Sequence, residues 1–155
     1  MVKFMLDDVS RRILRHLQND PELAAAELAQ KAGVTPAVCA RRLEKMRSDG
    51  ILLGQRAVIN WQALGYSVEV SLRFTLDKTQ RNAFDDFIEQ ARKVPEVLEI
   101  HTFLGRVDVR LTVLARDMAH YQEIYRVRIL TLPHINDIEA LMQIATIKTS
   151  EVLPL

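Results

Sequence analysis

The stretch that decides the fold runs from Ala25 to Glu44 and reads AAELAQKAGVTPAVCARRLE. Its first part ends at Gly33, the residue best able to adopt the left-handed conformation that closes a helix. Thr35 and Pro36 suit the start of a second helix, because a threonine hydroxyl caps a helix and a proline at the first helical position loses no hydrogen bond. The stretch therefore predicts two short helices around a tight corner.

The second helix has one apolar face, on which Cys39, Leu43 and Met46 recur at helical spacing. Its other faces carry small and basic side chains, which allow close approach to a DNA major groove and contact with phosphates and base edges. The residues expected to contact DNA are Thr35, Pro36, Ala37, Val38, Arg41, Arg42 and Lys45. Arg42 lies beside the apolar face and has an alternative partner in Glu27. The stretch predicts a helix-turn-helix, with a plain helical domain as the competing interpretation.

Charge is distributed unevenly along the 155 residues, whose formal net charge is only +1. This balance excludes an indiscriminate polybasic binder of nucleic acid. Residues 1–60 nevertheless hold ten Lys/Arg against seven Asp/Glu. The N-terminal part therefore has the sign of charge that a DNA-facing half requires.

The single cysteine, Cys39, excludes an intrachain disulfide, and its place on an apolar face predicts a buried thiol. No apolar run reaches the length of a membrane span, and Met1–Asp8 lacks the basic start and long apolar core of a signal peptide. We therefore expect a cytoplasmic protein with no membrane partner.

Two further segments flank the helical pair. Asp7 or Asp8 can cap a first helix that ends before Pro21. Ile51–Asn60 contains β-formers and predicts a strand that also connects two domains. Its start either forms a wing beside the groove, with Gln55 and Arg56 meeting phosphate, or pairs with its own symmetry mate.

From residue 67 the pattern becomes β-α-β-β-α-β. Alternating apolar and polar residues predict strands at 68–76, 97–103, 107–114 and 135–146. Thr79 and Asp117 are candidate caps of the two helices, and the second helix buries either Val127 or Arg128. This order is the ferredoxin-like α+β fold, with four antiparallel strands and both helices on one face. Because the other face is uncovered, we expect a homodimer built sheet to sheet or edge to edge. The apolar residues Val152, Leu153 and Leu155 predict docking on a neighbour.

Motifs of catalysis and metal binding are missing from the sequence. The histidines are scattered at positions 16, 101, 120 and 134, and no cysteine pair exists, so a zinc site is not expected. No glycine-rich phosphate loop and no nucleophile elbow occurs. Asp85 and Asp86 are expected to form a solvated helix face. We predict no enzyme activity, no metal and no cofactor.

The chain resembles the Lrp/AsnC, or feast/famine, transcription regulators along almost its whole length. The matching residues in the first half are Leu6-Asp7, Glu27-Leu28-Ala29, Gly33-Val34-Thr35 and Arg42-Leu43, and in the second half Gly105-x-x-Asp108, Asp117-Met118 and Leu132-Pro133. The resemblance implies a winged-helix-like helix-turn-helix with Thr35–Met46 as recognition helix. It also implies a C-terminal ACT-like (RAM) module, a dimer that often assembles into an octamer, and an amino-acid effector between subunits.

The resemblance also implies the domain division and an effector site. We expect a helix-turn-helix domain at 1–52 with its motif at 25–44, a strand linker at 53–66, and an effector-binding and oligomerisation domain at 67–155. The effector-binding residues expected from the family pattern are Leu104, Gly105, Arg106, Asp108 and Ala140.

Within this site, Gly105 and Asp108 match the family. A glycine lets the backbone approach a ligand, and a carboxylate can hold an ammonium group. Leu104 and Ala140 replace hydroxyl residues, and Arg106 replaces an acceptor with a donor that suits a carboxylate or phosphate. We therefore hypothesise that the ligand is not a plain neutral amino acid held in the usual way, or that the site is effector-blind. The alternatives are a solvated Arg106 and an Asp108 that satisfies turn amides.

These observations predict a two-domain transcription regulator that binds double-stranded operator DNA. Dimerisation would space two recognition helices one DNA turn or a multiple apart, and an amino acid or related carboxylate would modulate assembly or domain pose. One rival is an enzyme on the same scaffold, since the siroheme decarboxylases resemble this layout, but His101 and Arg110 are too few for a tetrapyrrole pocket. The other rival is a metabolite-binding module whose helical half contacts only protein.

Overall fold

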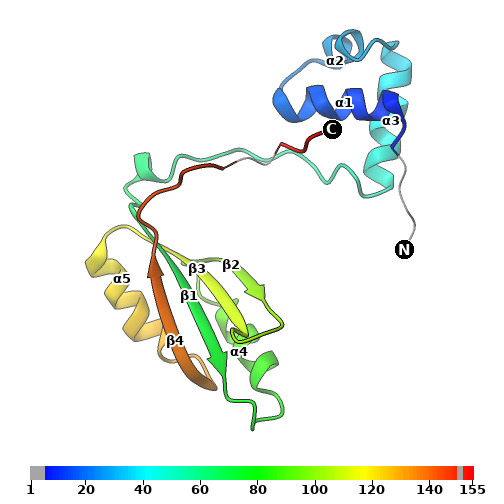
Figure 1. Ribbon diagram of the computed structural model, residues 1–155. Helices are drawn as coiled ribbons and strands as arrows, with labels where there is room; N and C mark the ends of the chain where they lie inside the picture. Colours follow the sequence, from blue (N-terminus) through cyan, green and yellow to red (C-terminus); the bar gives the residue numbers. More distant parts are fainter. Residues whose placement is uncertain (1–5, 150–151) are drawn as a thin grey trace. The chain divides into compact units, whose positions relative to one another are not determined.

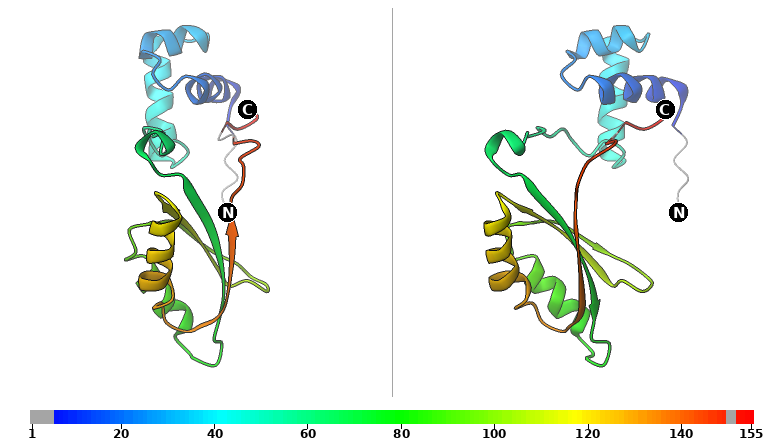
Figure 2. Two further views of the ribbon diagram at one scale, coloured as in Figure 1. Left: turned by 90° about the vertical axis from the view of Figure 1, so that its left-hand side faces the viewer. Right: turned by 60° about the vertical axis from the view of Figure 1, so that its left-hand side comes forward.

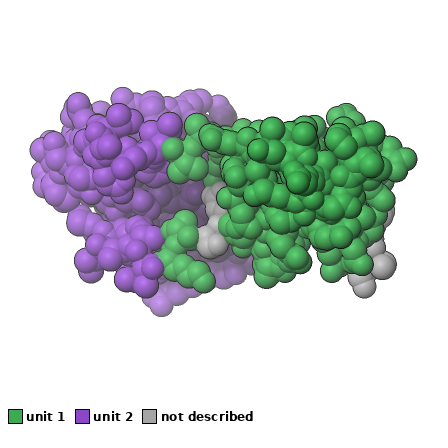
Figure 3. All heavy atoms as spheres, turned by 90° about the horizontal axis from the view of Figure 1, so that it is seen from above, with its two compact units in different colours: residues 1–58, 148–155 green, residues 59–147 purple. Residues whose placement is uncertain are grey.

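The computed structural model describes residues 6–149 and 152–155 and contains helices followed by a sheet covered with helices (Figure 1 and Figure 2). The chain divides into two compact units, one of residues 1–58 with 148–155 and one of residues 59–147 (Figure 3). Residues 148, 149 and 152–155 group with the helical unit in this division by contacts, and the predicted domain boundaries stay a prediction.

The helical unit contains α1 (Asp8–Asn19), α2 (Ala25–Lys31) and α3 (Pro36–Ser48). As predicted, the Asp7 carboxylate caps α1 by accepting from the Ser10 N–H at 2.8 Å, and the Thr35 hydroxyl caps α3 by accepting from the Val38 N–H at 3.3 Å. Gly33, with φ of +67°, turns the chain between α2 and α3. The predicted corner is confirmed.

The core of this unit lies where the three helices meet. Its fully buried residues are Ile13, Leu28, Ala29, Ala32, Cys39 and Met46. Burial raises the pKa of the Cys39 thiol, because a thiolate is disfavoured away from water. The prediction of a buried cysteine is therefore confirmed, and its position fixes α3 with the opposite, polar face outward.

The predicted strand at 51–60 is absent, although all of these residues are described. The segment after Ile51 adopts no regular structure and is largely exposed, with the Leu53 side chain 93% accessible. A strand needs a second backbone segment to satisfy its N–H and C=O groups, and this chain supplies no ladder here. The prediction of a strand that finds its partner within one chain is therefore wrong, and the alternative, in which the segment pairs with its own symmetry mate, stays a prediction.

The second unit begins with a short turn of 3₁₀ helix, η1 (Gln62–Leu64), and carries a four-stranded antiparallel sheet in the order β2-β3-β1-β4. The elements in chain order are β1 (Val68–Leu76), α4 (Ala83–Ala91), β2 (Val97–Thr102), β3 (Val109–Ala115), α5 (Met118–Ile124), the π-helical turn η2 (Tyr125–Ile129) and β4 (Ile135–Met142). Both helices cover one face of the sheet (Figure 2). The predicted ferredoxin-like fold is confirmed.

Alternation along the strands separates two faces. Val70, Leu72 and Phe74 of β1 point into the core beneath the helices, where the Phe74 and Phe87 rings lie 4.9 Å apart. On the opposite face, Glu69, Ser71, Arg73 and Thr75 of β1 and Arg110 and Thr112 of β3 are partly or fully accessible, whereas Leu114 is buried. This open face is where the second unit is left without a covering layer of its own.

Two details of the helices differ from the prediction. Thr79 does not cap α4, because its hydroxyl and N–H both bond to the Asp77 carboxylate in the preceding loop, and α4 begins after Asn82. At the end of α5 neither Val127 nor Arg128 is buried; Ile129 is. The π-helical turn inserts one residue, so the next inward position after Ile124 falls five residues later instead of three or four.

Residues 152–155 lie against α1. The Gln18 side-chain amide donates to the Leu153 oxygen at 2.8 Å and accepts from the Leu153 N–H at 3.0 Å, and Arg15 Nε donates to the Leu155 oxygen at 2.8 Å. The Leu153 side chain itself remains exposed. These hydrogen bonds join the backbone of the segment to side chains of α1, and docking of the apolar side chains on a neighbour stays a prediction.

Candidate nucleic-acid interface and effector-binding turn

The outer surface of α3 carries most of the side chains predicted to contact DNA. Thr35, Pro36, Ala37 and Arg41 are exposed, and Val38 is half-buried. The helix therefore begins with small side chains around a capped N-terminus, where free backbone N–H groups favour a phosphate. Among the described residues Arg41 forms no ion pair, so its guanidinium is available to DNA.

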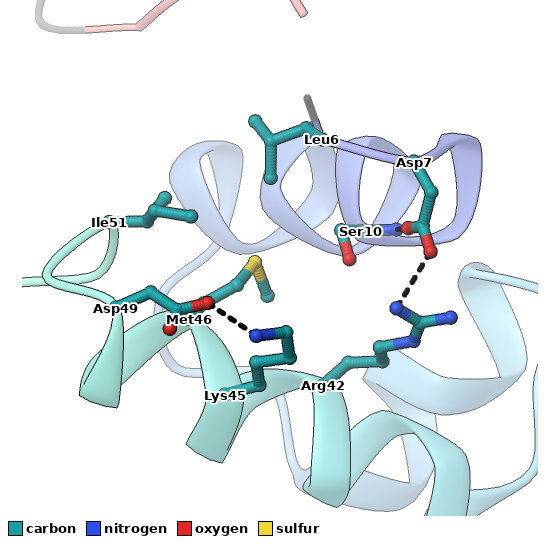
Figure 4. Close-up of a pocket in the computed structure, with 8 residues that line it drawn as sticks. All are labelled: Leu6, Asp7, Ser10, Arg42, Lys45, Met46, Asp49 and Ile51. Carbon is teal, nitrogen blue, oxygen red and sulfur yellow. Dashed lines mark hydrogen bonds and ion pairs between the residues drawn. The ribbon is translucent and has the colours of Figure 1, made fainter. Parts of the chain in front are cut away.

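Arg42 is held inside the helical unit. Its Nη1 lies 2.7 Å from Asp7 Oδ2, its side chain is 30% exposed, and its Nε is buried (Figure 4). The partner is Asp7 at the start of α1 and not Glu27, the alternative considered from sequence. Arg42 thus joins the N-terminus of α1 to the middle of α3 and helps to orient α3 within the helical unit.

The Asp7 carboxylate serves two contacts. The Ser10 backbone N–H lowers the pKa of Asp7 most, with further lowering from Ser10 and the Arg42 guanidinium. Asp7 therefore stays ionised at neutral pH, both as the cap of α1 and as the partner of Arg42. The sequence pointed to the cap, but the ion pair joins residues too far apart in the chain to be seen there.

Lys45 lines a cavity of about 60 Å³ together with Asp7 and Arg42 (Figure 4). Its Nζ lies 2.9 Å from Asp49 Oδ2. The side chain is 64% exposed, and a solvent-exposed pair of this kind contributes little free energy. Lys45 can therefore leave Asp49 for a phosphate at small cost. The predicted set of DNA contacts separates into an unpaired Arg41, a loosely paired Lys45 and a structural Arg42.

The predicted effector residues fall on the turn between β2 and β3 and on β4. Leu104 is fully exposed, Gly105 has a φ of +151°, and Arg106 is exposed. The Arg106 backbone oxygen accepts from the Thr75 hydroxyl at 3.3 Å. Ala140 is exposed on β4, and β1 lies between β4 and β3, so strand pairing does not bring Ala140 to the turn.

The Asp108 carboxylate forms hydrogen bonds and an ion pair that stabilise the turn. Its Oδ2 accepts from the Leu76 N–H at 2.9 Å, and its Oδ1 lies 3.1 Å from Lys78 Nζ, with the side chain 15% exposed. Its own N–H donates to the Phe74 oxygen at 2.9 Å. This arrangement supports the structural alternative for Asp108, because both carboxylate oxygens already have partners within the chain.

A second group of polar residues lies on the open face of the sheet and was not singled out as a ligand site from sequence. Arg73 on β1 and Arg110 on β3 are register partners, and with Phe103 and Val107 they line a cavity of about 220 Å³. The predicted alternation of both strands already placed these arginines on the same face. The missing signal was the strand register, which sets them directly opposite each other.

The described residues contain neither a membrane-spanning helix nor a metal-binding cluster. No helix among them is long and apolar enough to cross a membrane. No cluster of three or more histidine, cysteine, aspartate or glutamate side chains within residues 6–149 and 152–155 could hold a metal ion.

Comparison with known proteins decides the family. The AsnC-type helix-turn-helix domain matches residues 6–47, and the Lrp/AsnC ligand binding domain matches residues 69–153. The chain belongs to the Lrp/AsnC family. The two matches coincide with the two halves recognised from sequence, and this Lrp/AsnC chain thus combines a DNA-binding motif with a ligand-binding module.

Relatives of known name and structure agree with this assignment. The leucine-responsive regulatory protein of Escherichia coli K12 is 29% identical over 148 residues, covering 96% of this chain and 90% of the relative. An AsnC family transcriptional regulator from Agrobacterium tumefaciens is 32% identical with a TM-score of 0.86, covering 96% of this chain and 97% of the other. A transcriptional regulator from Neisseria meningitidis, solved as a complex with L-methionine, has a TM-score of 0.89 at 26% identity, covering 97% of each chain.

Proposed function

We propose that this Lrp/AsnC chain is a sequence-specific DNA-binding transcription regulator whose DNA affinity or assembly responds to a small metabolite. The observation that carries the proposal is the surface of α3, where a hydroxyl-capped start and small side chains precede an unpaired Arg41. Such a surface fits a major groove, because small residues allow close approach and arginine reaches base edges or phosphates. The proposed role is regulatory and not enzymatic, and the proposed site of action is the cytoplasm.

The proposed regulator acts as a homodimer, with an octamer as a further assembly. Support comes from apolar side chains that the single chain leaves in water, among them Val58, Ile144 and Ile147, each more than nine-tenths exposed. The open sheet face, apart from the cavity beside Arg73 and Arg110, adds a surface with no covering layer in the chain itself. A second copy would remove this apolar surface from solvent and would set two α3 helices one DNA turn, roughly 34 Å, or a multiple apart.

The proposed effector site lies at the turn that contains Leu104, Gly105, Arg106 and Asp108, with Ala140 contributed across the subunit junction. The Neisseria relative binds L-methionine in its crystal structure. In this chain the hydroxyls are replaced and Asp108 already has partners within the fold. We therefore propose that a plain neutral amino acid is not held here in the usual way.

The experiment that tests this function is selection of genomic DNA fragments by the purified protein, repeated with candidate metabolites. We expect enrichment of sites with two-fold related halves, because a dimer reads both halves with the same helix. Sedimentation of the same sample should give a dimer or a larger closed assembly. A monomer that retains no duplex at low ionic strength would contradict the proposal.

The effector is tested by calorimetry with the twenty amino acids and with branched 2-oxo acids. Ordinary tight binding of leucine or asparagine would refute the altered specificity. Absence of any heat with all compounds would support an effector-blind site.

A further inference from the structure

Two arginines lie directly opposite each other on the open face of the sheet. Arg73 on β1 and Arg110 on β3 are partners in the antiparallel register, between the inward pairs that form the core. Like charges in directly opposed positions destabilise a sheet. The pair therefore needs negative charge from elsewhere.

The chain supplies this charge to only one of the two. Arg73 Nη1 lies 3.3 Å from Glu139 Oε2 on β4. Arg110 Nη2 instead lies 3.2 Å from His101 Nδ1, a ring nitrogen that carries no negative charge and that lies 3.9 Å from Glu99 Oε2. Glu99, the nearby acid on β2, accepts from the Thr112 hydroxyl at 3.2 Å. Within the described part of the chain, no carboxylate pairs with Arg110.

The Arg110 guanidinium is also incompletely hydrogen-bonded. Its Nε is buried and has no acceptor among the described residues. The guanidinium carbon lies 5.9 Å from the centre of the Phe103 ring, which positions the group over an apolar surface. A buried donor without an acceptor is unfavourable, so an acceptor that reaches Arg110 would be bound with a gain in free energy.

The space beside these groups is a cavity of about 220 Å³ lined by Arg73, Arg110, Phe103 and Val107. At about 30 Å³ per water, it has the volume of roughly seven water molecules. We propose that this cavity binds a small organic carboxylate. Its two oxygens accept from Arg73 and Arg110, which present planar arrays of donors suited to a carboxylate, and its short apolar chain lies on Phe103 and Val107.

The same geometry selects among carboxylates. An amino acid also brings an ammonium group, and two acids that could hold it already have partners within the chain: Glu139 pairs with Arg73, and Asp108 bonds to the Leu76 N–H and Lys78. The cavity itself is lined by two cations and two apolar residues. It therefore favours a carboxylate without an ammonium group, such as a 2-oxo acid. The inference that this carboxylate is the effector rests on the proposed function. The inference that the cavity binds a carboxylate does not depend on it.

Calorimetry on the full chain tests the site, with 4-methyl-2-oxopentanoate as probe and L-leucine and 4-methylpentanamide as comparison compounds. We expect the oxo acid to bind, leucine to bind at least tenfold more weakly, and the uncharged amide not to bind. Arg110→Gln should weaken binding of the oxo acid at least tenfold. Arg73→Gln should weaken it less, because Arg73 already pairs with Glu139. Arg92→Gln is the matched control, since Arg92 is exposed at the end of α4 on the helical layer.

Two further measurements keep the outcome decisive. If Arg110→Gln fails to fold, Arg110→Lys retains the charge but loses the planar fork and should still weaken the probe severalfold. Sedimentation of each variant detects the competing role, in which a second copy supplies the acceptor. Loss of the assembly in Arg110→Gln together with no probe binding by the unaltered protein would overturn the proposal, as would equal affinities of the unaltered protein and Arg110→Gln.

A DNA mobility-shift titration of the same samples tests the proposed regulator separately from the carboxylate site. Unaltered protein that shifts DNA but ignores the probe removes the carboxylate site and leaves the proposed regulator intact. Protein that binds the probe but no DNA does the reverse.

Discussion

The cations of α3 and those of the open sheet face differ in how many of them have an acidic partner within the chain. In the helical unit, Arg42 pairs with Asp7 and Lys45 with Asp49, which leaves Arg41 available. In the sheet, two arginines face each other, and Arg110 has neither a carboxylate partner nor an acceptor for its Nε among the described residues. A cation matched within its own unit supports the fold, whereas an unmatched one indicates a surface that is completed by something outside the chain.

The largest expected effect is the loss of DNA affinity when Arg41, the unpaired cation of α3, is replaced. Arg41→Ala is expected to weaken operator binding by about 1–3 kcal/mol if Arg41 reads a base, and by less, with a shallower salt dependence, if it holds a phosphate. Mobility-shift titrations at several salt concentrations measure both. Arg126→Ala, which removes an exposed arginine from η2, serves as the control and should leave the titration unchanged. An unaltered titration for Arg41→Ala would remove this residue from the interface.

Removing the acid that matches Arg42 should act on stability. Asp7→Ala deletes the cap of α1 and the partner of Arg42, and the loss of a cap alone costs about 0.5–2 kcal/mol. Chemical denaturation followed by circular dichroism measures the free energy of unfolding. Asp8→Ala is the matched control, because it removes the same charge from the first turn of α1, where an acid contributes about 0.3–1 kcal/mol. Equal losses for both variants would show that the Asp7 contacts are unimportant.

Arg42 itself should matter little to DNA once folding is intact. Arg42→Gln is expected to change operator affinity by less than about 1 kcal/mol, the range of a partly exposed ion pair, and to leave the salt slope unchanged. Loss of a phosphate contact would instead reduce that slope by about one. Comparison with Arg41→Ala in the same titrations decides whether the two neighbouring arginines have separate roles.

The smallest effect is expected when the pH is lowered and the contribution of Asp7 to the free energy of unfolding is lost. The folded-state pKa of Asp7 lies below its ordinary value, so the stability that this group contributes is complete above the unfolded pKa near 3.9. It is lost as the pH falls through the lowered pKa of the folded state. Denaturation midpoints measured from pH 6 downward should therefore decline less steeply for Asp7→Asn than for the unaltered protein. Identical slopes would exclude Asp7 from the acid response.

Local chemistry explains what was predictable. The caps at Asp7, Thr35 and Asp117 and the turn at Gly33 follow from a few adjacent residues, and each is present. The strands of the sheet follow from period-two alternation, which one buried face imposes. Thus most helices and strands, their order and the exposed surface of α3 could be predicted from the sequence.

Features that join distant residues were not predictable in the same way. The Asp7–Arg42 pair and the opposition of Arg73 and Arg110 depend on helix packing and strand register. The inward position of Ile129 depends on a π-helical turn that no residue type announces. The segment 51–60 shows the converse, since within one chain its β-propensity finds no backbone partner and forms no ladder.

Asp108 gives the β2–β3 turn a direct reporter. Its carboxylate accepts from the Leu76 amide, which lies at the far end of β1. Any molecule that shifts the turn must lengthen or shorten this bond, and the amide proton of one residue would register the change in its NMR chemical shift and in its rate of hydrogen exchange. Occupancy of the turn could thus be followed at Leu76 without labelling the ligand and before its identity is known.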